Sequence, residues 1–243
     1  MSSFYSVLAA HYDELFGCDG ATIAFLGEEG ATAGAHVLDV ACGTGACARM
    51  LLHRGVDAYG TDLSPPMIEI AREKAREAGI DRSRFSVADM LETDAHPRAP
   101  FDLVFCIGNS IAHLGSLDDV GRFVRAAVHA LAADRGRLVL QYVDVEGLEE
   151  GETFALPDLT SSAAVMRRAY RRESPSRIRF DAQLTARGET VQTISQYLLV
   201  IPTAELIGLV RQAGFQSVAV HGGFDRVPAD RSRWVRVVVG ALS

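Results

Sequence analysis

The chain has 243 residues, of which 48% are hydrophobic and 23% charged, and its formal net charge is −7. This composition predicts one globular domain, with or without an insertion, and the acidic charge argues against a nucleic-acid binder. No apolar run approaches the roughly 18 residues of a transmembrane helix. Residues 1–12 also lack the basic and apolar regions of a signal peptide, so we expect a cytoplasmic protein that is not membrane-bound.

The first two thirds of the chain alternate between strand-like and helix-like segments. Buried strands are predicted at 36–41, 56–62, 85–90, 101–108 and 136–143. Helices are predicted at 46–55, 64–78 and 116–132, with Gly55 and Gly79 as stop signals. Strands separated by single helices are typical of a parallel sheet with helices on both faces. We therefore expect an α/β fold with a doubly wound, Rossmann-like sheet of seven strands.

The pattern changes after Val143. Three strand-like stretches at 163–172, 177–187 and 190–200 are followed by a helix at 203–213 and a strand pair at 215–220 and 232–242. These segments predict an antiparallel insertion after the fifth strand and an antiparallel pair that completes the sheet. The single domain then divides into a helical cap, a core, an insertion facing the substrate, and a C-terminal part, at 1–35, 36–143, 144–201 and 202–243.

The cysteines give no sign of a metal site. The four are Cys18, Cys42, Cys47 and Cys106; none forms a C-x-x-C pair, and no histidine lies at zinc-ligand spacing from them. We expect four free thiols and no bound metal.

A glycine-rich turn follows the first predicted strand. Gly43 and Gly45 begin a G-x-G-x-x-A sequence that opens a helix, which is the fingerprint of a loop that binds a nucleotide-containing cofactor. Asp62, at the end of the second strand, is placed to accept hydrogen bonds from ribose hydroxyls. NAD is one candidate ligand. However, Asp39 inside the first strand would repel a pyrophosphate and can hold a cationic amino group, and Asp89 can accept from an adenine amino group.

Four motifs carry a family resemblance. HVLDVACGTG at 36–45, YGTDLSPPM at 59–67, FSVADM at 85–90 and FDLVFCIGNSIAHL at 101–114 resemble the successive motifs of class I S-adenosylmethionine (SAM)-dependent methyltransferases. The resemblance implies SAM as cofactor, with S-adenosylhomocysteine (SAH) as product. It also implies which residues hold the methionine moiety, namely Asp39 and the backbone of Ala41, Gly43 and Gly45.

The same resemblance assigns the adenosine end of the cofactor. Asp62 would bridge the ribose hydroxyls, and Leu63 and Met67 would pack on the adenine. Asp89 and the Met90 amide would contact its polar edge. Cys106 and Ile107 would line the region of the sulfonium.

The segment CIGNSIAHL is further similar to glycine N-methyltransferases and to amino-sugar N-methyltransferases. By that similarity, Asn109 faces the substrate, and Ser110 and His113 lie beside the cofactor. An N-terminal helix of these families covers SAM and contributes a tyrosine, for which Tyr12 is the first candidate and Tyr5 the second. We expect in-line transfer of a methyl group to a nitrogen of a small molecule, with an acceptor wall formed by Asn109, Tyr142, Asp144 and Tyr197.

Two departures from the glycine enzymes bear on the substrate. Val143 stands where those enzymes carry an arginine that binds the amino-acid carboxylate, and no basic residue precedes Arg49 to bind the carboxylate of SAM. Glycine is therefore a doubtful substrate unless an arginine of the insertion substitutes. Seven arginines lie between 161 and 187, either on a solvated or subunit-contacting face that would support a homodimer, or on a lid that attracts an anionic substrate.

Other functions stay open at this point. The main alternative is a metal-independent O-methyltransferase acting on a phenol or carboxylate, with His113 or His221 as base. Methylation of nucleic acid is disfavoured because the chain is acidic and the fourth strand ends in GNS. A non-catalytic SAM-binding protein is disfavoured because all the expected cofactor residues are present.

Overall fold

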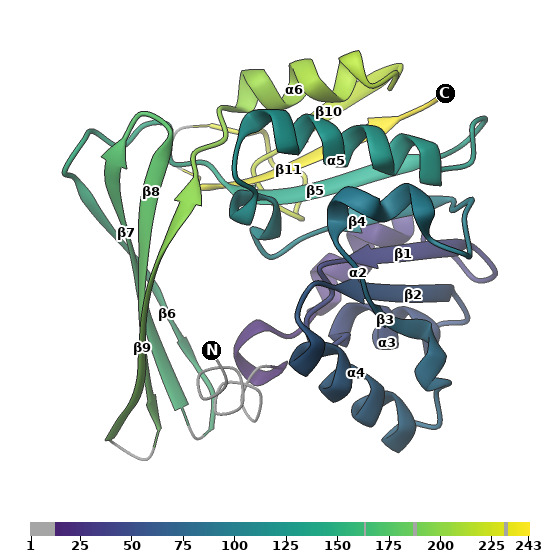
Figure 1. The fold of residues 1–243 in the computed structure, drawn as a ribbon, viewed down its shortest axis with the longest axis horizontal. Helices are drawn as coiled ribbons and strands as arrows, with labels where there is room; N and C mark the ends of the chain where they lie inside the picture. Colours follow the sequence, from purple (N-terminus) through teal and green to yellow (C-terminus); the bar gives the residue numbers. More distant parts are fainter. Residues whose placement is uncertain (1–12, 163, 187–188, 231–232) are drawn as a thin grey trace.

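The structure is a computed structural model that describes residues 13–162, 164–186, 189–230 and 233–243. It contains two sheets (Figure 1). The larger has seven strands in the order β10-β11-β5-β4-β1-β2-β3, and the smaller has four antiparallel strands in the order β6-β7-β8-β9. No helix in these ranges is long and apolar enough to cross a membrane.

The larger sheet is built mostly from the predicted core. β1, β2, β3, β4 and β5 run parallel, and β11 pairs antiparallel with both β5 and β10. Its strands are β1 (His36–Val40), β2 (Asp57–Asp62), β3 (Phe85–Val87), β4 (Leu103–Cys106), β5 (Arg137–Val143), β10 (Ser217–His221) and β11 (Val235–Ala241). The predicted seven-stranded α/β fold is confirmed.

Helices cover both faces of this sheet because successive side chains of each strand point to opposite sides. Leu38 and Val40 pack into one core cluster with α5 and α6, whereas Val37 packs into a second cluster with α2, α3 and α4. The helices are α2 (Gly20–Glu28), α3 (Ala46–Leu52), α4 (Pro65–Glu77), α5 (Leu117–Ala130) and α6 (Thr203–Gln212). Short 3₁₀ helices lie at η1 (Arg82–Arg84), η2 (Met90–Ala95) and η3 (Ser110–His113).

The insertion has four strands rather than three. They are β6 (Thr153–Thr160), β7 (Ala164–Ser174), β8 (Arg177–Ala186) and β9 (Glu189–Leu199). β6 was missed because it has no buried residue, contains Pro157, and shifts register against β7 between Leu156 and Leu159. The four strands form a curved layer beside the ends of the parallel strands (Figure 1).

The glycine-rich turn packs tightly against one aromatic ring. A Cβ built on Gly45 would lie 2.4 Å from the ring of Phe85, and one on Gly60 would lie 2.9 Å from the same ring. Phe85 is fully buried at the start of β3. The two glycines therefore let the turn after β1 sit directly on the sheet, which fixes its position.

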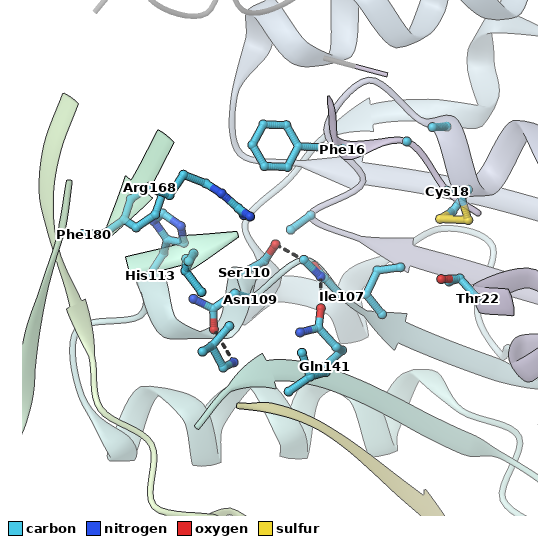
Figure 2. Close-up of a pocket in the computed structure, with 18 of the residues that line it drawn as sticks. Phe16, Cys18, Thr22, Ile107, Asn109, Ser110, His113, Gln141, Arg168 and Phe180 are labelled. Carbon is cyan, nitrogen blue, oxygen red and sulfur yellow. Dashed lines mark hydrogen bonds between the residues drawn. A yellow bond between two sulfur atoms is a disulfide. The ribbon is translucent and has the colours of Figure 1, made fainter. Parts of the chain in front are cut away.

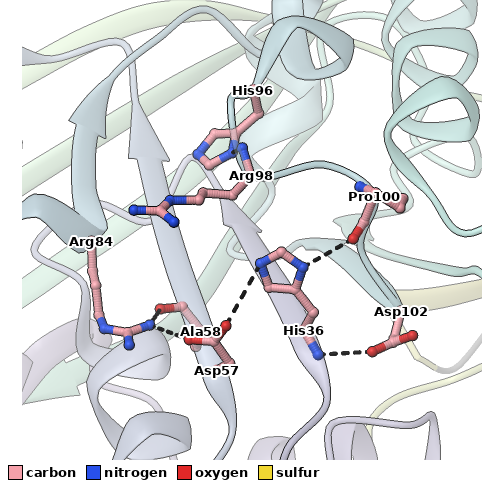
Figure 3. Close-up of polar contacts among 8 residues, drawn as sticks. All are labelled: His36, Asp57, Ala58, Arg84, His96, Arg98, Pro100 and Asp102. Atoms are coloured by element: carbon pink, nitrogen blue, oxygen red, sulfur yellow. Dashed lines mark hydrogen bonds and ion pairs between the residues drawn. The ribbon is translucent and has the colours of Figure 1, made fainter.

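At the amino ends of the parallel strands, a set of polar contacts links β1 to its neighbours (Figure 3). Asp102 accepts a hydrogen bond from the His36 amide at 2.8 Å and another from the Arg135 side chain at 2.6 Å. The His36 ring contacts the Pro100 carbonyl, and Arg84 pairs with Asp57 at 2.5 Å. Burial raises the pKa of Asp102, but the bonds from His36 and Arg135 outweigh it and leave that pKa lowered.

We predict that Asp102→Asn lowers the free energy of unfolding at pH 7 by about 1 kcal/mol, because it weakens two charge-assisted hydrogen bonds. Since the pKa of Asp102 is lowered in the folded state, its contribution is present above pH 4 and is lost as the pH falls through the folded pKa. Urea unfolding from pH 7 to pH 2 measures both effects. Asp134→Asn is the matched control, because Asp134 is 78% exposed beside the same arginine. Equal stability of the two variants would contradict the prediction.

A disulfide joins the segment before α2 to the first turn of α3. It links Cys18 to Cys47, which are 29 residues apart in the sequence. The expectation of four free thiols is therefore wrong for this pair and holds for Cys42 and Cys106. Sequence spacing gave no warning, because the two residues become neighbours only when the turn after β1 brings α3 beside the segment that leads into α2.

We predict that reduction, or Cys18→Ser, lowers the free energy of unfolding by about 2–4 kcal/mol, because the cross-link restricts the unfolded chain. Urea unfolding with and without dithiothreitol measures the loss. The Cys18→Ser variant serves as the control, since the reductant has no disulfide left to break in it. Recovery of Cys18 and Cys47 as free thiols in a non-reducing peptide map would show the pairing to be absent.

Candidate functional site

A cavity of about 540 Å³ lies between the carboxyl edge of the parallel strands and the insertion (Figure 2). Its floor comes from the turn after β1, the loop after β4, and the end of β5. Its other wall comes from β6, β7, β8 and β9, and a third side comes from residues 16–18 and 22. Carboxyl ends of strands in an open parallel sheet are the usual place for a ligand.

Asp39 is the most unusual charged group in this cavity. Its side chain is only 3% exposed, and it makes no ion pair within the described part of the chain. Burial raises its pKa well above the ordinary value, the nearby carboxylate of Asp62 raises it further, and a hydrogen bond from the Ala48 backbone lowers it only in part. A buried carboxylate of this kind favours a cationic ligand.

Asp62 shapes the turn beside it. Its carboxylate accepts hydrogen bonds from the Gly43 amide at 2.9 Å and from the Ser64 amide at 2.8 Å. Burial raises its pKa against the effect of those bonds. Two apolar side chains next to it stay open to solvent, Leu63 at 67% and Val87 at 45% exposure. The carboxylate keeps free lone pairs for hydroxyl groups, and the exposed apolar surface suits a flat ring.

The backbone of the turn is tightly bent, and the amides of Gly43 and Gly45 donate hydrogen bonds within the protein. Ala41, Gly43 and Gly45 have φ values of 59°, 55° and 76°, in the left-handed region. A non-glycine residue such as Ala41 is rare there and is held by its surroundings. All three belong to the backbone segment that the family resemblance assigns to the methionine moiety of SAM. Ala41 lines the cavity.

The other expected cofactor residues lie at the same edge but play mixed parts. Met67 is buried on α4, and the Asp89 carboxylate accepts from the Leu91 amide at the start of η2. Met90 begins η2, and Cys106 is fully buried at the end of β4. Ile107 lines the cavity. Tyr12 and Tyr5 lie outside the described residues.

Asn109 organises the loop after β4. Its φ is 65°, its side-chain carbonyl accepts from the Val143 amide at 2.9 Å, and its side-chain amide donates to the Tyr170 hydroxyl at 3.1 Å. The loop is held further by the Gly108 amide, which donates to the side chain of Gln141 at 2.6 Å. Asn109 lines the cavity, and its two side-chain hydrogen bonds join β5 to β7.

Ser110 and His113 follow on η3 and line the same cavity. The Ser110 hydroxyl donates to the Ile107 carbonyl at 2.9 Å. Burial lowers the pKa of His113, and the nearby Asp62 carboxylate opposes that shift. His113 is consequently neutral at pH 7 and can accept a proton.

Three residues of the expected acceptor wall, and His221, the base considered for O-methyl transfer, do not line the cavity. Tyr142 is fully buried and bonds to Thr203, because its neighbours Gln141 and Val143 take the positions that face the cavity. Tyr197 is 62% exposed, since β9 turns Gln196 and Leu198 inward instead. Asp144 pairs with Arg236, and the ring of His221 packs edge-on against Phe25.

Sequence reasoning missed Tyr170 and Gln196, and it did not single out Arg168 among the seven arginines of the insertion. Tyr170, Arg168 and Gln196 line the cavity. Burial raises the pKa of Tyr170 to about 12, so its hydroxyl stays protonated. The signal was present in β7, where period two places Met166, Arg168 and Tyr170 on one face.

The described residues contain no group of three or more histidine, cysteine, aspartate or glutamate side chains that would hold a metal ion.

The predicted core of the chain resembles known methyltransferases in sequence. Residues 37–134 match the family described as "Methyltransferase domain". Over 131 residues, the chain is 38% identical to a glycine/sarcosine N-methyltransferase of Parasynechococcus marenigrum, covering 53% of this chain and 44% of that protein. Over 113 residues it is 34% identical to a ubiquinone biosynthesis O-methyltransferase of Xylella fastidiosa, covering 46% and 43%. Each match spans less than half of the relative's length.

Solved structures extend the likeness to the whole chain. A SAM-dependent methyltransferase of Clostridium acetobutylicum has a TM-score of 0.79 at 17% identity, covering 98% of this chain and 99% of that one. The SAM-bound amino-pentose methyltransferase CalS10 of Micromonospora echinaspora has a TM-score of 0.72 at 21% identity, covering 100% and 99%. Residues 37–134 therefore match a methyltransferase family, and the chain has, insertion included, the same fold as these solved structures.

Proposed function

We propose that this protein is an enzyme that transfers the methyl group of SAM to a nitrogen atom of a small molecule. The observation that carries the proposal is the buried Asp39 carboxylate, which has no cationic partner in the described structure and faces a cavity at the edge of a methyltransferase domain. SAM brings a positively charged amino group and a sulfonium, which are the charges such a site favours.

The chain's own residues fit the rest of the cofactor. Asp39 would bind the amino group, and the backbone of the turn from Ala41 to Gly45 would surround the methionine moiety. Asp62 would accept from the ribose hydroxyls, with Leu63 and Val87 against the adenine. Asp89 and Met90 would meet the adenine edge, and Cys106, Ile107 and Ser110 would lie near the sulfur.

The methyl acceptor would bind on the side of the cavity that the insertion forms. SAM supplies an electrophilic methyl group on a sulfonium, so the protein's part is to place a neutral nitrogen in line with it. Asn109 and Tyr170, joined by a hydrogen bond of 3.1 Å, would orient that nitrogen. The neutral imidazole of His113 would take up the proton that the nitrogen loses, and the nearby Asp62 carboxylate would stabilise the charge formed.

Methyl transfer to oxygen is the second candidate. The neutral His113 in the cavity could serve as base for a phenol, and one relative of comparable identity is named as an O-methyltransferase. We favour nitrogen because a protein named as an amino-pentose methyltransferase shares the fold over 99% of its length.

We predict that the affinity for SAM falls as the pH is lowered from 7 to 5. The pKa of Asp39 is raised in the free protein, so Asp39 takes up a proton above pH 3.8, and the protonated form no longer attracts the cation. Calorimetric titration with SAM measures the trend.

Asp39→Asn should weaken binding at pH 7 by about tenfold or more and flatten the pH dependence, since a charged hydrogen bond is lost. Asp94→Asn, at an exposed carboxylate that does not line the cavity, is the matched control. Unchanged affinity in Asp39→Asn would exclude Asp39 from the cofactor site.

The proposed reaction is tested with isotopically labelled SAM and three groups of acceptors. These are amino acids including glycine and sarcosine, nucleotide-linked amino sugars, and simple phenols. We predict label on nitrogen, in amounts that drop in Asp62→Ala because that variant weakens the cofactor site by about 1–3 kcal/mol. Label on phenol oxygen without any amine product would favour the second candidate. Failure to bind SAM would refute both.

A further inference from the structure

We infer that the methyl acceptor carries a single carboxylate on an apolar body, and that Arg168 binds this carboxylate from the wall of the insertion. The inference rests on the proposed function and concerns the same cavity. It assigns a role in substrate selection to one arginine of the insertion and separates that arginine from its neighbours.

Arg168 differs from the other described arginines of β7 and β8 in what it contacts. Arg167 lies 3.6 Å from Asp158, Arg171 lies 3.6 Å from Glu173, and Arg179 lies 3.0 Å from Asp181. Arg172 is buried and donates to the carbonyls of Val145 and Pro175, and Arg177 donates to Gly115. Each of these five arginines therefore has an acidic or carbonyl partner outside the lining of the cavity.

Arg168 has no ion pair among the described residues. One terminal nitrogen donates to the Pro157 carbonyl at 3.0 Å, while its Nε is buried and has no hydrogen-bond partner. Burial lowers the pKa of this guanidinium, which is the mark of a cation removed from water. An unpaired buried donor is costly, so a ligand that accepts from it gains more than one that meets a solvated arginine.

The side chain extends from the antiparallel sheet into the cavity (Figure 2). Around it the same wall is mostly apolar, formed by Leu156, Met166, Phe180, Ile194 and Leu198. The neutral polar groups of Asn109 and Tyr170 lie on the side of the loop after β4. An acceptor with an apolar body and one anionic group matches this arrangement.

The charge balance argues for one carboxylate rather than a diphosphate. Among the described residues that line the cavity, Arg168 is the one permanently cationic side chain, and Asp39 is the one carboxylate. A nucleotide diphosphate would bring at least two negative charges and a polar base into an apolar wall. A monocarboxylate pairs with the fork of one guanidinium.

Binding of 4-phenylbutyrate, compared with its neutral analogue 4-phenylbutyramide, tests the inference. Both are titrated into the wild type, Arg168→Gln and Arg167→Gln, with and without saturating SAH. Arg167→Gln is the matched control, because Arg167 is the adjacent residue, 71% exposed on the opposite face of β7. Uridine diphosphate is titrated as the probe for a nucleotide-linked acceptor.

We expect the acid to bind the wild type about tenfold more tightly than the amide, and Arg168→Gln to abolish this difference. Arg167→Gln should leave both affinities within about twofold, as for an exposed charge. Affinity for SAH and the midpoint of thermal unfolding should be unchanged in Arg168→Gln, which shows that the fold and the cofactor site are intact.

Four results would overturn the inference. They are equal binding of acid and amide to the wild type, no binding of the acid at all, an acid affinity that survives Arg168→Gln, and tighter binding of uridine diphosphate than of the acid. A loss of SAH affinity in Arg168→Gln would instead assign this arginine to the carboxylate of the cofactor. A wild type that binds no SAH refutes the proposed function, and the titrations without SAH still test the anion site.

Discussion

The structure is organised around the Asp39 carboxylate, which is buried with no cationic partner among the described residues. Asp39 lies in a central strand, between β2 and β4, and burial and the neighbouring Asp62 both raise its pKa. Ionising it costs free energy that the hydrogen bond from Ala48 offsets only in part. The rest of the fold must supply that stability, and it does so with two apolar clusters, one on each face of the sheet. A site destabilised in this way gains affinity for a cation because the ligand removes the cost.

Period-two alternation decides which side chains of the strands reach the cavity. In β5, Gln141 and Val143 face it while Tyr142 bonds to Thr203 behind the sheet. In β9, Gln196 faces it while Tyr197 is exposed. Tyr142 and Tyr197 carry the hydroxyl expected of an acceptor site. Each, however, is one residue away from a side chain that faces the cavity, and a shift of one residue changes the face of the sheet. Tyr170 carries the same hydroxyl on the face of β7 that lines the cavity, and its hydrogen bond to Asn109 joins the two sheets.

The parts that the sequence predicted are those whose signals are local. Buried strands, a helix that begins with Pro65 after Ser64, and the glycines that pack on Phe85 each depend on neighbouring residues. The parts that it missed depend on pairing across long separations. β6 has a weak pattern and exists because β7 offers it an edge, and the Cys18–Cys47 disulfide requires two distant segments to meet. Arg167 and Arg168, by contrast, are separated by a local signal, because period-two alternation in β7 sends adjacent side chains to opposite faces.

The charges of the cavity give it a direction. Asp39 lies at the carboxyl ends of the parallel strands and Arg168 lies on the antiparallel wall. The neutral side chains of Asn109, on the loop after β4, and Tyr170, on β7, meet in a hydrogen bond. A cation is therefore favoured at one end and an anion at the other. The net charge of −7 gives no general attraction for anions, so selection of an anionic acceptor would depend on a contact inside the cavity rather than on long-range steering. The half-buried guanidinium of Arg168 meets that requirement, because its interaction with an anion strengthens as water is excluded.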